Sequence, residues 1–336
     1  MQPYTIRGVP MSNTNFYMKW SALTLFIALL AAGCKHADNS IYPESTSSDS
    51  ASDSFPGPST PSPSTEKPVN TVPSKLEKIS FYSEALQKQM RLNVYLPPGY
   101  STSLRYPVLY MLHGYFGTES AWMPEMQLEK EADRLILADR IQPMIIVAPQ
   151  LDNSYGLNSA EKYRMETPAD PVHSRYYGKY QDYFEQDVLF YVDSHYSTIS
   201  SKEGRYVGGF SMGGFAALSA AFRHPELFSK VGGHSPALWT DWSRVPRMKS
   251  WLYPNKAARL DRDPLLLAKN GDMSGISVYL DCGDADDYKL YVGTKKLYEV
   301  LQSKGIPSEY HLNPGKHNRT YWKSQIEHYL LFYGAK

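Results

Sequence analysis

The stretch Gly208–Gly214 reads G-G-F-S-M-G-G and places one serine, Ser211, in a run of glycines. Its centre has the pattern G-x-S-x-G. A short apolar segment, Tyr206–Phe210, precedes the serine as an expected strand, and a strongly helix-forming segment, Gly213–Arg223, follows it. On such a strand–turn–helix junction the serine Oγ is exposed, and glycines are needed because the strand and the helix approach too closely for side chains. Ser211 is therefore a candidate nucleophile; the alternative is a glycine-rich junction without chemistry.

A serine hydroxyl is a weak nucleophile, so it needs a base within hydrogen-bond reach and an acid that orients the base. After a serine on such a turn, the acid comes next along the chain and the histidine last. An expected strand, Ile276–Leu280, leads into D-C-G-D-A-D-D at Asp281–Asp287. We choose Asp286 as the acid, with Asp287 second and Asp284 third. The alternatives are helix caps, solvated loop charge or a calcium site, although the D-x-D-x-D-G spacing is absent.

The base must be chosen among nine histidines. His317 lies in N-P-G-K-H-N-R-T-Y-W, a loop between a strand pattern near Tyr310 and the last expected helix. It follows Asp286, as the chain order requires, and the neighbouring Gly315 allows the loop to reach across the strand ends. The alternative is a lone surface histidine. Ser211, Asp286 and His317 thus form the hypothesis for a nucleophile, an acid and a base.

Two backbone N–H groups are expected to bind the negative charge that develops on the attacked carbonyl oxygen. One belongs to Met212, directly after the serine. The other belongs to Tyr115 in H-G-Y-F-G, the loop after the strand Pro107–Leu112. Gly114 lets this loop turn back over the site, and His113 is interpreted as a structural residue that holds the loop.

Strands and helices alternate along the rest of the chain, which predicts an α/β fold with a mostly parallel central sheet and helices on both faces. Antiparallel edge strands are expected at the start, at Ile79–Leu86 and Met90–Leu96, because apolar and polar residues alternate there. The buried strands are expected at Pro107–Leu112, Met144–Ala148, Tyr206–Phe210 and Ile276–Leu280. The helices are expected at Gln127–Arg140, Tyr183–Tyr196, Gly213–Arg223, Tyr288–Gly305 and Tyr321–Tyr333. Sites in such folds lie at the carboxyl ends of the strands.

The composition excludes some partners. With 35 basic and 34 acidic residues the net charge is +1, which argues against a nucleic-acid partner held by bulk charge. Two cysteines, Cys34 and Cys282, imply no disulfide framework.

The first 34 residues are expected to be a targeting segment. The apolar run Ala22–Ala32 is too short to span a bilayer, Lys19 precedes it, and A-A-G-C follows it, ending at Cys34. This arrangement resembles a bacterial lipoprotein signal, which implies a lipidated Cys34, a lipid anchor and, because Lys35 follows, an outer-membrane location. The alternative is a plain signal peptide with an incidental cysteine. Translation could start at Met1 or at Met18.

Residues 35–75 are rich in serine and proline and have almost no large apolar side chains, so we expect a disordered tether. Residues 76–336 are expected to form one catalytic domain, a suitable length for a single α/β unit.

Five segments of this domain occur in a distinctive order: R-L-N-V-Y-L-P-P-G-Y, Y-P-V-L-Y-M-L-H-G, G-G-F-S-M-G-G-F-A-A-L, R-H-P-E-L-F and G-x-H-x-x-x-Y-W. Together they resemble the putative-esterase family, the esterase D and feruloyl-esterase-like branch of the α/β-hydrolases, over Lys78–Tyr333. The resemblance implies a serine carboxylesterase that needs no metal or cofactor, with its catalytic residues at Ser211, Asp286 and His317. Substrates differ widely within the family, from feruloyl and acetylated carbohydrates to siderophores and thioesters.

Substrate contacts are expected from two segments. In G-G-H-S-P-A-L-W, His234 and Trp239 are interpreted as pocket-lining residues, with a core position or a second candidate base as alternatives for His234. The segment Asp152–Tyr180 is rich in tyrosine, and four of its rings could stack on a sugar or a phenol, namely Tyr155, Tyr163, Tyr176 and Tyr177. A solvated surface loop is equally consistent with this segment.

The function predicted from the sequence is hydrolysis of a small-molecule or carbohydrate ester through an acyl-enzyme. Two alternatives remain open: an acyltransferase that uses the same three residues, and a non-catalytic surface binding protein on a hydrolase scaffold. The sequence does not predict an oligomeric state.

Overall fold

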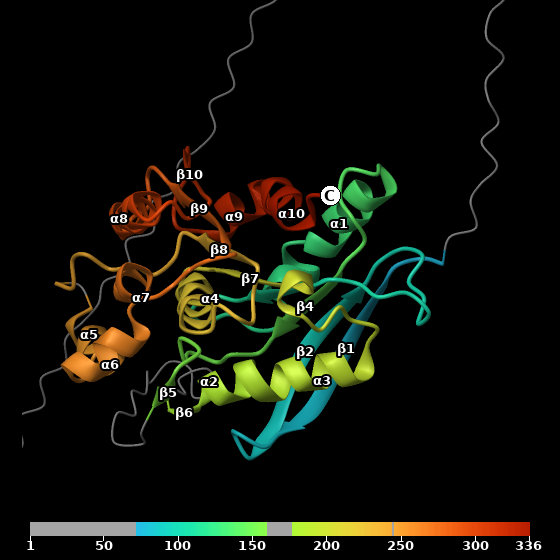
Figure 1. Cartoon of the computed structure of the whole chain (residues 1–336), viewed down its shortest axis with the longest axis horizontal. Coiled ribbons are helices and arrows are strands. Elements are labelled where there is room, and N and C mark those ends of the chain that lie inside the picture. The colour runs from blue at the N-terminus through green and yellow to red at the C-terminus, as the bar shows by residue number, and fades with distance from the viewer. Residues whose placement is uncertain (1–71, 160–176, 244) are drawn as a thin grey trace, which may run out of the picture. The chain divides into compact units, whose positions relative to one another are not determined.

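The computed structural model describes residues 72–159, 177–243 and 245–336, and a central sheet of eight strands runs through this part of the chain (Figure 1). The strand order is β1-β2-β4-β3-β7-β8-β9-β10. The strands are β1 (Lys75–Ser83), β2 (Lys88–Leu96), β3 (Val108–Leu112), β4 (Ile145–Pro149), β7 (Arg205–Phe210), β8 (Lys230–His234), β9 (Ser277–Gly283) and β10 (Ser308–Asn313). Two short strands, β5 (Asn158–Ser159) and β6 (Gly178–Lys179), pair separately. The signal segment with Cys34, residues 35–71 of the expected tether, Tyr163 and Tyr176 lie outside the described residues. The expected end of the tether at residue 75 is wrong by one residue, because Lys75 already pairs with Leu96 as the first residue of β1.

The parallel strands in the middle of the sheet are more deeply buried than the antiparallel strand at its edge. β1 and β2 pair antiparallel, β2 pairs antiparallel with β4, and every other pair in the large sheet is parallel. The parallel strands β3, β4 and β7 are buried at every residue, which explains their continuous apolar sequences, whereas the edge strand β1 alternates between exposed and buried positions. The predicted fold class, a mostly parallel α/β sheet with antiparallel strands at its amino-terminal edge, is confirmed.

Helices cover both faces of the sheet. They are α1 (Leu128–Leu137), α2 (Tyr180–Asp182), α3 (Leu189–His195), α4 (Met212–Arg223), α5 (Pro246–Leu252), α6 (Lys256–Arg262), α7 (Pro264–Asn270), α8 (Leu290–Ser303), α9 (Arg319–Ser324) and α10 (Ile326–Gly334). A π-helical segment, Tyr183–Val188, joins α2 to α3, and shorter turns lie at Ala121–Glu125 and Lys202–Gly204. None of the helices in the described part of the chain is both long enough and apolar enough to cross a membrane.

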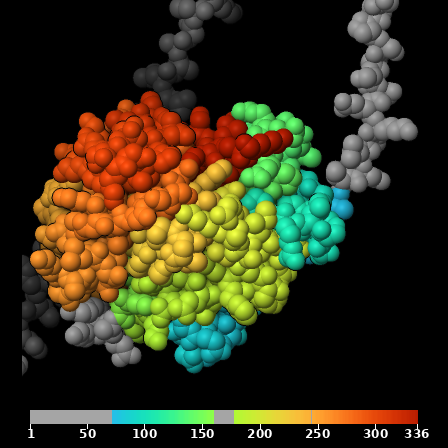
Figure 2. Space-filling model, in the orientation of Figure 1, coloured from blue at the N-terminus to red at the C-terminus, as the bar shows by residue number. Residues whose placement is uncertain are grey.

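The two faces of the sheet have separate apolar cores. In β3, Val108 and Tyr110 pack with the core that α3, α4 and α8 cover, while Leu109 and Met111 pack with the core that α1 and α10 cover. In the ribbon and the space-filling view, α1 (green) lies beside α10 (red), so elements from distant parts of the sequence close one face together (Figures 1 and 2). This alternation is the period-2 pattern of a strand buried on both sides.

Several helices differ from the expected ones. The expected last helix is two helices, α9 and α10, which meet at Gln325, and the helix expected from Tyr183 already begins at Tyr180. The helices α5, α6 and α7 were not predicted, although Pro246 and Pro264 stand in their first turns and Asn255 caps α6. These helices have only seven residues each, so tertiary packing rather than local propensity decides whether they form.

One edge of the sheet gathers the loops that carry the candidate residues. Leu112 at the end of β3 is level with Gly209 in β7, His234 at the end of β8 is level with Asp281 in β9, and β10 continues alongside β9. The loops that follow β3, β7, β9 and β10 therefore open at the same edge, which is where parallel α/β sheets place their sites.

Candidate active site

Ser211 occupies a strained turn between β7 and α4. Its backbone angles are φ 56° and ψ −115°, a positive φ that non-glycine residues rarely adopt. A Cβ atom at Gly209 or Gly213 would collide with the carbonyl oxygen of Leu112 in the neighbouring strand. A Cβ atom at Gly209 would also collide with the backbone of Gly213, so the expected close approach of the strand β7 and the helix α4 is confirmed. The contact with β3 is a second constraint on the same two glycines.

His317 connects this serine to a carboxylate. Its Nε2 atom lies 2.9 Å from Ser211 Oγ, and its Nδ1 atom lies 2.8 Å from Asp286 Oδ2. Because an ionised carboxylate only accepts hydrogen bonds, the proton of the neutral imidazole belongs on Nδ1, which leaves Nε2 to accept from the serine hydroxyl. The Asp286 side chain is fully buried and that of His317 is 9% exposed, so little water competes for these bonds.

Asp286 is held as the ionised form. Burial acts to raise the pKa of its carboxyl group, but the hydrogen bond and charge of His317 and the backbone N–H of Tyr288 outweigh burial and lower the pKa below its usual value. Of the other two carboxylates considered, Asp284 accepts a hydrogen bond from the N–H of Gly315 at 3.1 Å, and Asp287 is exposed. Asp286 is thus the carboxylate that contacts the imidazole, and Asp284 supports the loop that carries His317.

Two aromatic rings enclose the imidazole of His317. Tyr288 and Trp322 both stand edge-on to it, with ring centroids at 5.1 and 5.0 Å and interplanar angles of 90° and 87°. The N–H of Ala285 donates to the carbonyl of Gly315 at 2.9 Å, which ties the histidine loop to the loop of Asp286. The imidazole is therefore fixed in orientation by its neighbours as well as by its two hydrogen bonds.

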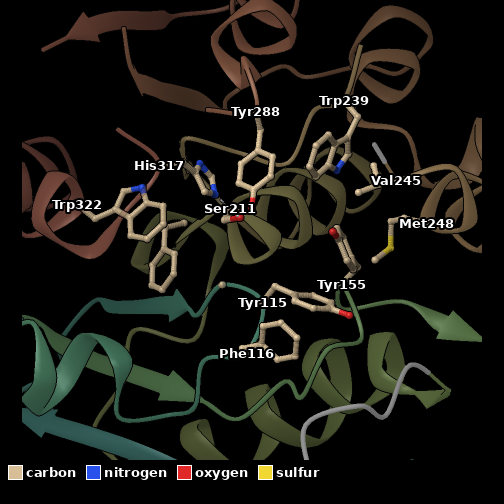
Figure 3. A pocket seen from close by; sticks show the side chains of 12 residues that line it. Tyr115, Phe116, Tyr155, Ser211, Trp239, Val245, Met248, Tyr288, His317 and Trp322 are labelled. Atoms are coloured by element: carbon tan, nitrogen blue, oxygen red, sulfur yellow. Dashed lines mark hydrogen bonds between the residues drawn. The ribbon is translucent and has the colours of Figure 1, made fainter. Parts of the chain in front are cut away.

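A cavity of about 450 Å³ opens beside Ser211 and His317. Most of its lining is aromatic: the full set is Gly114, Tyr115, Phe116, Tyr155, Phe210, Ser211, Trp239, Val245, Met248, Tyr288, His317 and Trp322. Figure 3 shows Ser211 between two groups of side chains, with His317 and Trp322 on one side and Trp239, Met248 and Tyr155 on the other. The expected pocket residues Trp239 and Tyr155 both line this cavity.

Two polar atoms lie at the side of the cavity away from His317. The Nε1 atom of Trp239 is buried and makes no hydrogen bond of normal geometry within the described chain. Burial raises the pKa of the Tyr155 hydroxyl, and the neighbouring Trp239 side chain offsets part of this effect. An otherwise apolar part of the cavity therefore contains a protonated phenol beside a buried indole N–H, and the phenol can donate a hydrogen bond to a polar atom.

The loop after β3 faces the serine, as Tyr115 lines the cavity and Gly114 packs against Phe210. The N–H of Phe116 donates to Asn153 at 2.8 Å, which anchors the loop. His113 is buried; its Nε2 accepts from the N–H of Leu151 at 2.9 Å, and its Nδ1 lies 2.8 Å from the carbonyl of Gly114. These contacts agree with a structural role for His113.

Met212 is the first residue of α4 and directly follows Ser211. The amino terminus of α4, which is the positive end of the helix dipole, thus lies at the serine. This position favours a negative charge that develops there.

Residues 83–333 match the family described as "Putative esterase". The chain belongs to this family. It is 25% identical over 259 residues to an endo-1,4-beta-xylanase/feruloyl esterase of Xylanibacter ruminicola, a match that covers 75% of this chain but only 30% of that relative's length.

Solved structures share the fold of this esterase-family chain. One is a ferulic acid esterase, 23% identical, with a TM-score of 0.64 over 78% of this chain and 98% of the other. Another is the ferulic acid esterase of Anaeromyces mucronatus in complex with ferulic acid, 21% identical, with a TM-score of 0.60 over 79% of this chain and 92% of the other. At these identities the likeness establishes the α/β-hydrolase fold.

The expectation that His234 contacts substrate is wrong for this member of the family. Its side chain is fully buried, bonds through Nδ1 to Asp281 at 2.8 Å and stacks on Tyr329 at 3.6 Å between ring centroids. The side chain of this last residue of β8 points toward the α10 face of the sheet, away from the cavity, because side chains alternate along a strand. His234 is also out of position for the second-base alternative.

Six cavity residues of this esterase were not assigned to a pocket from the sequence: Phe116, Phe210, Val245, Met248, Tyr288 and Trp322. Tyr288 and Trp322 follow Asp286 and His317 by two and five positions, so proximity in sequence could have indicated them. Met248 belongs to α5, which no local pattern predicted. Among the residues with described positions, no group of three His, Cys, Asp or Glu side chains is arranged to hold a metal ion.

Proposed function

We propose that this chain is a serine carboxylesterase in which Ser211 is the nucleophile, His317 the general base and acid, and Asp286 the orienting carboxylate. The observation that carries the proposal is the continuous hydrogen-bonded series from Asp286 through His317 to Ser211, at 2.8 and 2.9 Å, beside an aromatic cavity. The family match supports ester hydrolysis as the reaction class.

In the first half of the reaction, Ser211 Oγ attacks the ester carbonyl carbon while its proton moves to His317 Nε2. The carbonyl oxygen becomes an oxyanion, which the N–H groups of Tyr115 and Met212 hold. Asp286 keeps Nδ1 protonated and stabilises the imidazolium. The tetrahedral intermediate then collapses, the bond to the alcohol oxygen breaks, and His317 Nε2 returns the proton to that alcohol, leaving an acyl-enzyme on Ser211.

In the second half, water replaces the alcohol. His317 Nε2 removes a proton from the water as its oxygen attacks the acyl carbon, and the same proton then passes to Ser211 Oγ as the acyl bond breaks. The products are a carboxylic acid and the regenerated serine. Donors held in place for the oxyanion are typically worth about 10²–10³ in turnover each.

The cavity supports an aromatic acyl group as the preferred substrate part. Because His317 must protonate the departing oxygen, the alcohol lies on the side of His317 and Trp322, and the acyl group lies on the side of Tyr155 and Trp239 (Figure 3). That second side offers flat apolar walls with two polar atoms, which suits a ring that carries a hydroxyl or methoxy substituent. The curated relative is named a feruloyl esterase, and one structural neighbour was solved with ferulic acid, which agrees with this choice.

The test compares the wild type with Ser211→Ala on p-nitrophenyl acetate and on methyl ferulate. We expect the variant to lose measurable turnover of both esters and to lose labelling by a fluorophosphonate probe, while its melting temperature stays close to that of the wild type. Turnover that persists in folded Ser211→Ala protein would refute the proposed nucleophile.

We also propose that the mature protein is a lipoprotein attached to the membrane through Cys34, with the serine- and proline-rich residues that follow as a tether to the catalytic domain, whose first strand begins at Lys75. The support is the sequence alone: a basic residue, a short apolar run and small residues directly before the cysteine. An envelope location, in the outer membrane, follows from this hypothesis.

A further inference from the structure

A buried carboxylate that the proposed reaction does not use lies in β9. Asp281 is fully buried, and three donors reach its side chain. His234 Nδ1 lies 2.8 Å from Oδ1, while the hydroxyls of Tyr321 and Tyr329 donate to Oδ2 at 2.7 and 2.9 Å. Burial and the charge of Asp281 both raise the pKa values of the two tyrosines, so the phenols remain protonated donors.

Stability alone is a weak reason for such a cluster. Moving a carboxylate out of water costs several kcal/mol before its partners offset the cost, and well-packed apolar side chains often replace buried ion pairs without loss of stability. A fully satisfied polar cluster does fix the segments that supply its donors relative to one another. The segments whose side chains meet at Asp281 therefore indicate which parts of the chain this cluster holds in place.

Tyr321 links Asp281 to the loop that carries His317. It lies in α9, directly after that loop, and Asn313 at the start of the loop donates to the same phenol oxygen at 3.4 Å. Gly315 packs so closely on the Tyr321 ring that a Cβ atom there would collide with it. The loop therefore closes around Tyr321, and the next residue, Trp322, packs edge-on to the imidazole of His317 (Figure 3).

Tyr329 provides an internal comparison. It donates to the same Oδ2 atom of Asp281 at nearly the same distance and is also buried, but it lies in α10. No residue of α10 lines the cavity. The two phenols thus donate to the same carboxylate oxygen, one from α9 and one from α10. Only α9 directly follows the loop of His317.

We propose that Tyr321 is a positioning residue for the esterase reaction. Its hydrogen bond to Asp281 holds the His317 loop at the distance from Ser211 that proton transfer requires. The inference rests on the proposed function. Displacing a catalytic group by about 1 Å can cost about 10²-fold in rate. Because the bonds between the Asp286 loop and Gly315 remain, we expect a smaller fall when the phenol is removed, roughly tenfold in kcat.

The experiment compares Tyr321→Phe with the matched variant Tyr329→Phe in the full chain, using methyl ferulate. Each variant removes one hydroxyl from Asp281 Oδ2, so we expect similar decreases in melting temperature. We expect kcat to fall roughly tenfold in Tyr321→Phe and less than about twofold in Tyr329→Phe, with KM in both within about twofold of wild type. The rate of fluorophosphonate labelling of Ser211 should fall in parallel with kcat.

The two failures are distinguishable. A wild type without esterase activity would overturn the proposed function and this inference together. An active wild type with equal kcat values in the two variants, or a Tyr321→Phe protein that does not fold, would overturn the inference alone, because the phenol would then serve stability and not position.

Discussion

The Nε2 atom of His317 lies 2.9 Å from the Oγ atom of Ser211, although 106 residues separate them in the sequence. The contact depends on the sheet, since the serine follows β7 and the histidine follows β10, three positions further along the strand order. Asp286, after the intervening β9, completes the series at 2.8 Å. A hydroxyl that is inert in water is thus placed against a base whose tautomer is set by a buried carboxylate.

The role of Asp286 is testable against its neighbour. We expect Asp286→Asn to lower kcat about 10³–10⁴-fold with little change in KM, because an amide no longer holds the imidazole in the reactive tautomer. Asp287→Asn is the matched control, since it removes the same charge from the next, exposed residue, and its kcat should stay within about twofold of wild type. Steady-state kinetics on p-nitrophenyl acetate would decide. A larger loss in Asp287→Asn than in Asp286→Asn would reverse the assignment of the acid.

The lowered pKa of Asp286 predicts a pH-dependent contribution to stability. Burial raises this pKa, but the His317 hydrogen bond and charge more than compensate, so the folded state holds the carboxylate ionised to lower pH than the unfolded chain does. The stabilisation is therefore present above the unfolded value of about 4 and is lost as pH falls through the lower folded value. We expect the difference in melting temperature between wild type and Asp286→Asn to shrink as the pH falls below about 4. A difference that grows on acidification would contradict the sign.

Local patterns were sufficient to indicate the site. The loops of Ser211, Asp286 and His317 each follow an expected parallel strand, and carboxyl ends of parallel strands meet at one edge of a sheet. The glycines around Ser211 indicated a tight turn between a strand and a helix, and the close approach of Gly209 to Gly213 and of both glycines to β3 explains them. The ends of strands are visible in local patterns, and the order of the three residues is read directly from the sequence. Neither requires knowledge of the packing.

The lining of the cavity depends on longer-range packing. Whether His234 faces the cavity or the core depends on the alternation of side chains along β8, and a shift of one residue reverses the answer. Met248 comes from a seven-residue helix that packing stabilises, so no periodic pattern pointed to it. The sequence therefore indicated the three candidate catalytic residues better than the residues that line the cavity.

The proposed lipid anchor predicts a change in cell fractionation. If Cys34 is lipidated, wild-type protein should sediment with the membrane fraction and should incorporate labelled palmitate. Cys34→Ser should prevent lipidation, so that the label is absent from the variant and the protein is no longer recovered as a lipidated membrane form. Cys282→Ser is the control for loss of a cysteine elsewhere, because Cys282 is buried inside the domain. Equal palmitate labelling of wild type and Cys34→Ser would refute the anchor.

The polar side of the cavity predicts selectivity for the acyl ring. Tyr155 lines the cavity opposite His317, and its hydroxyl is held protonated by burial, so it can bond to a hydroxyl or methoxy oxygen on the substrate. We expect Tyr155→Phe to lower kcat/KM for methyl ferulate about fivefold to thirtyfold, which is the loss of one hydrogen bond of about 1–2 kcal/mol. Methyl cinnamate, which has the same ring without those oxygens, should change less than about twofold, and so should p-nitrophenyl acetate, because neither can use the bond. The ratio of kcat/KM between the ferulate and the cinnamate ester isolates this contact from any general loss of activity. An unchanged ratio would show that the hydroxyl of Tyr155 does not select the acyl group.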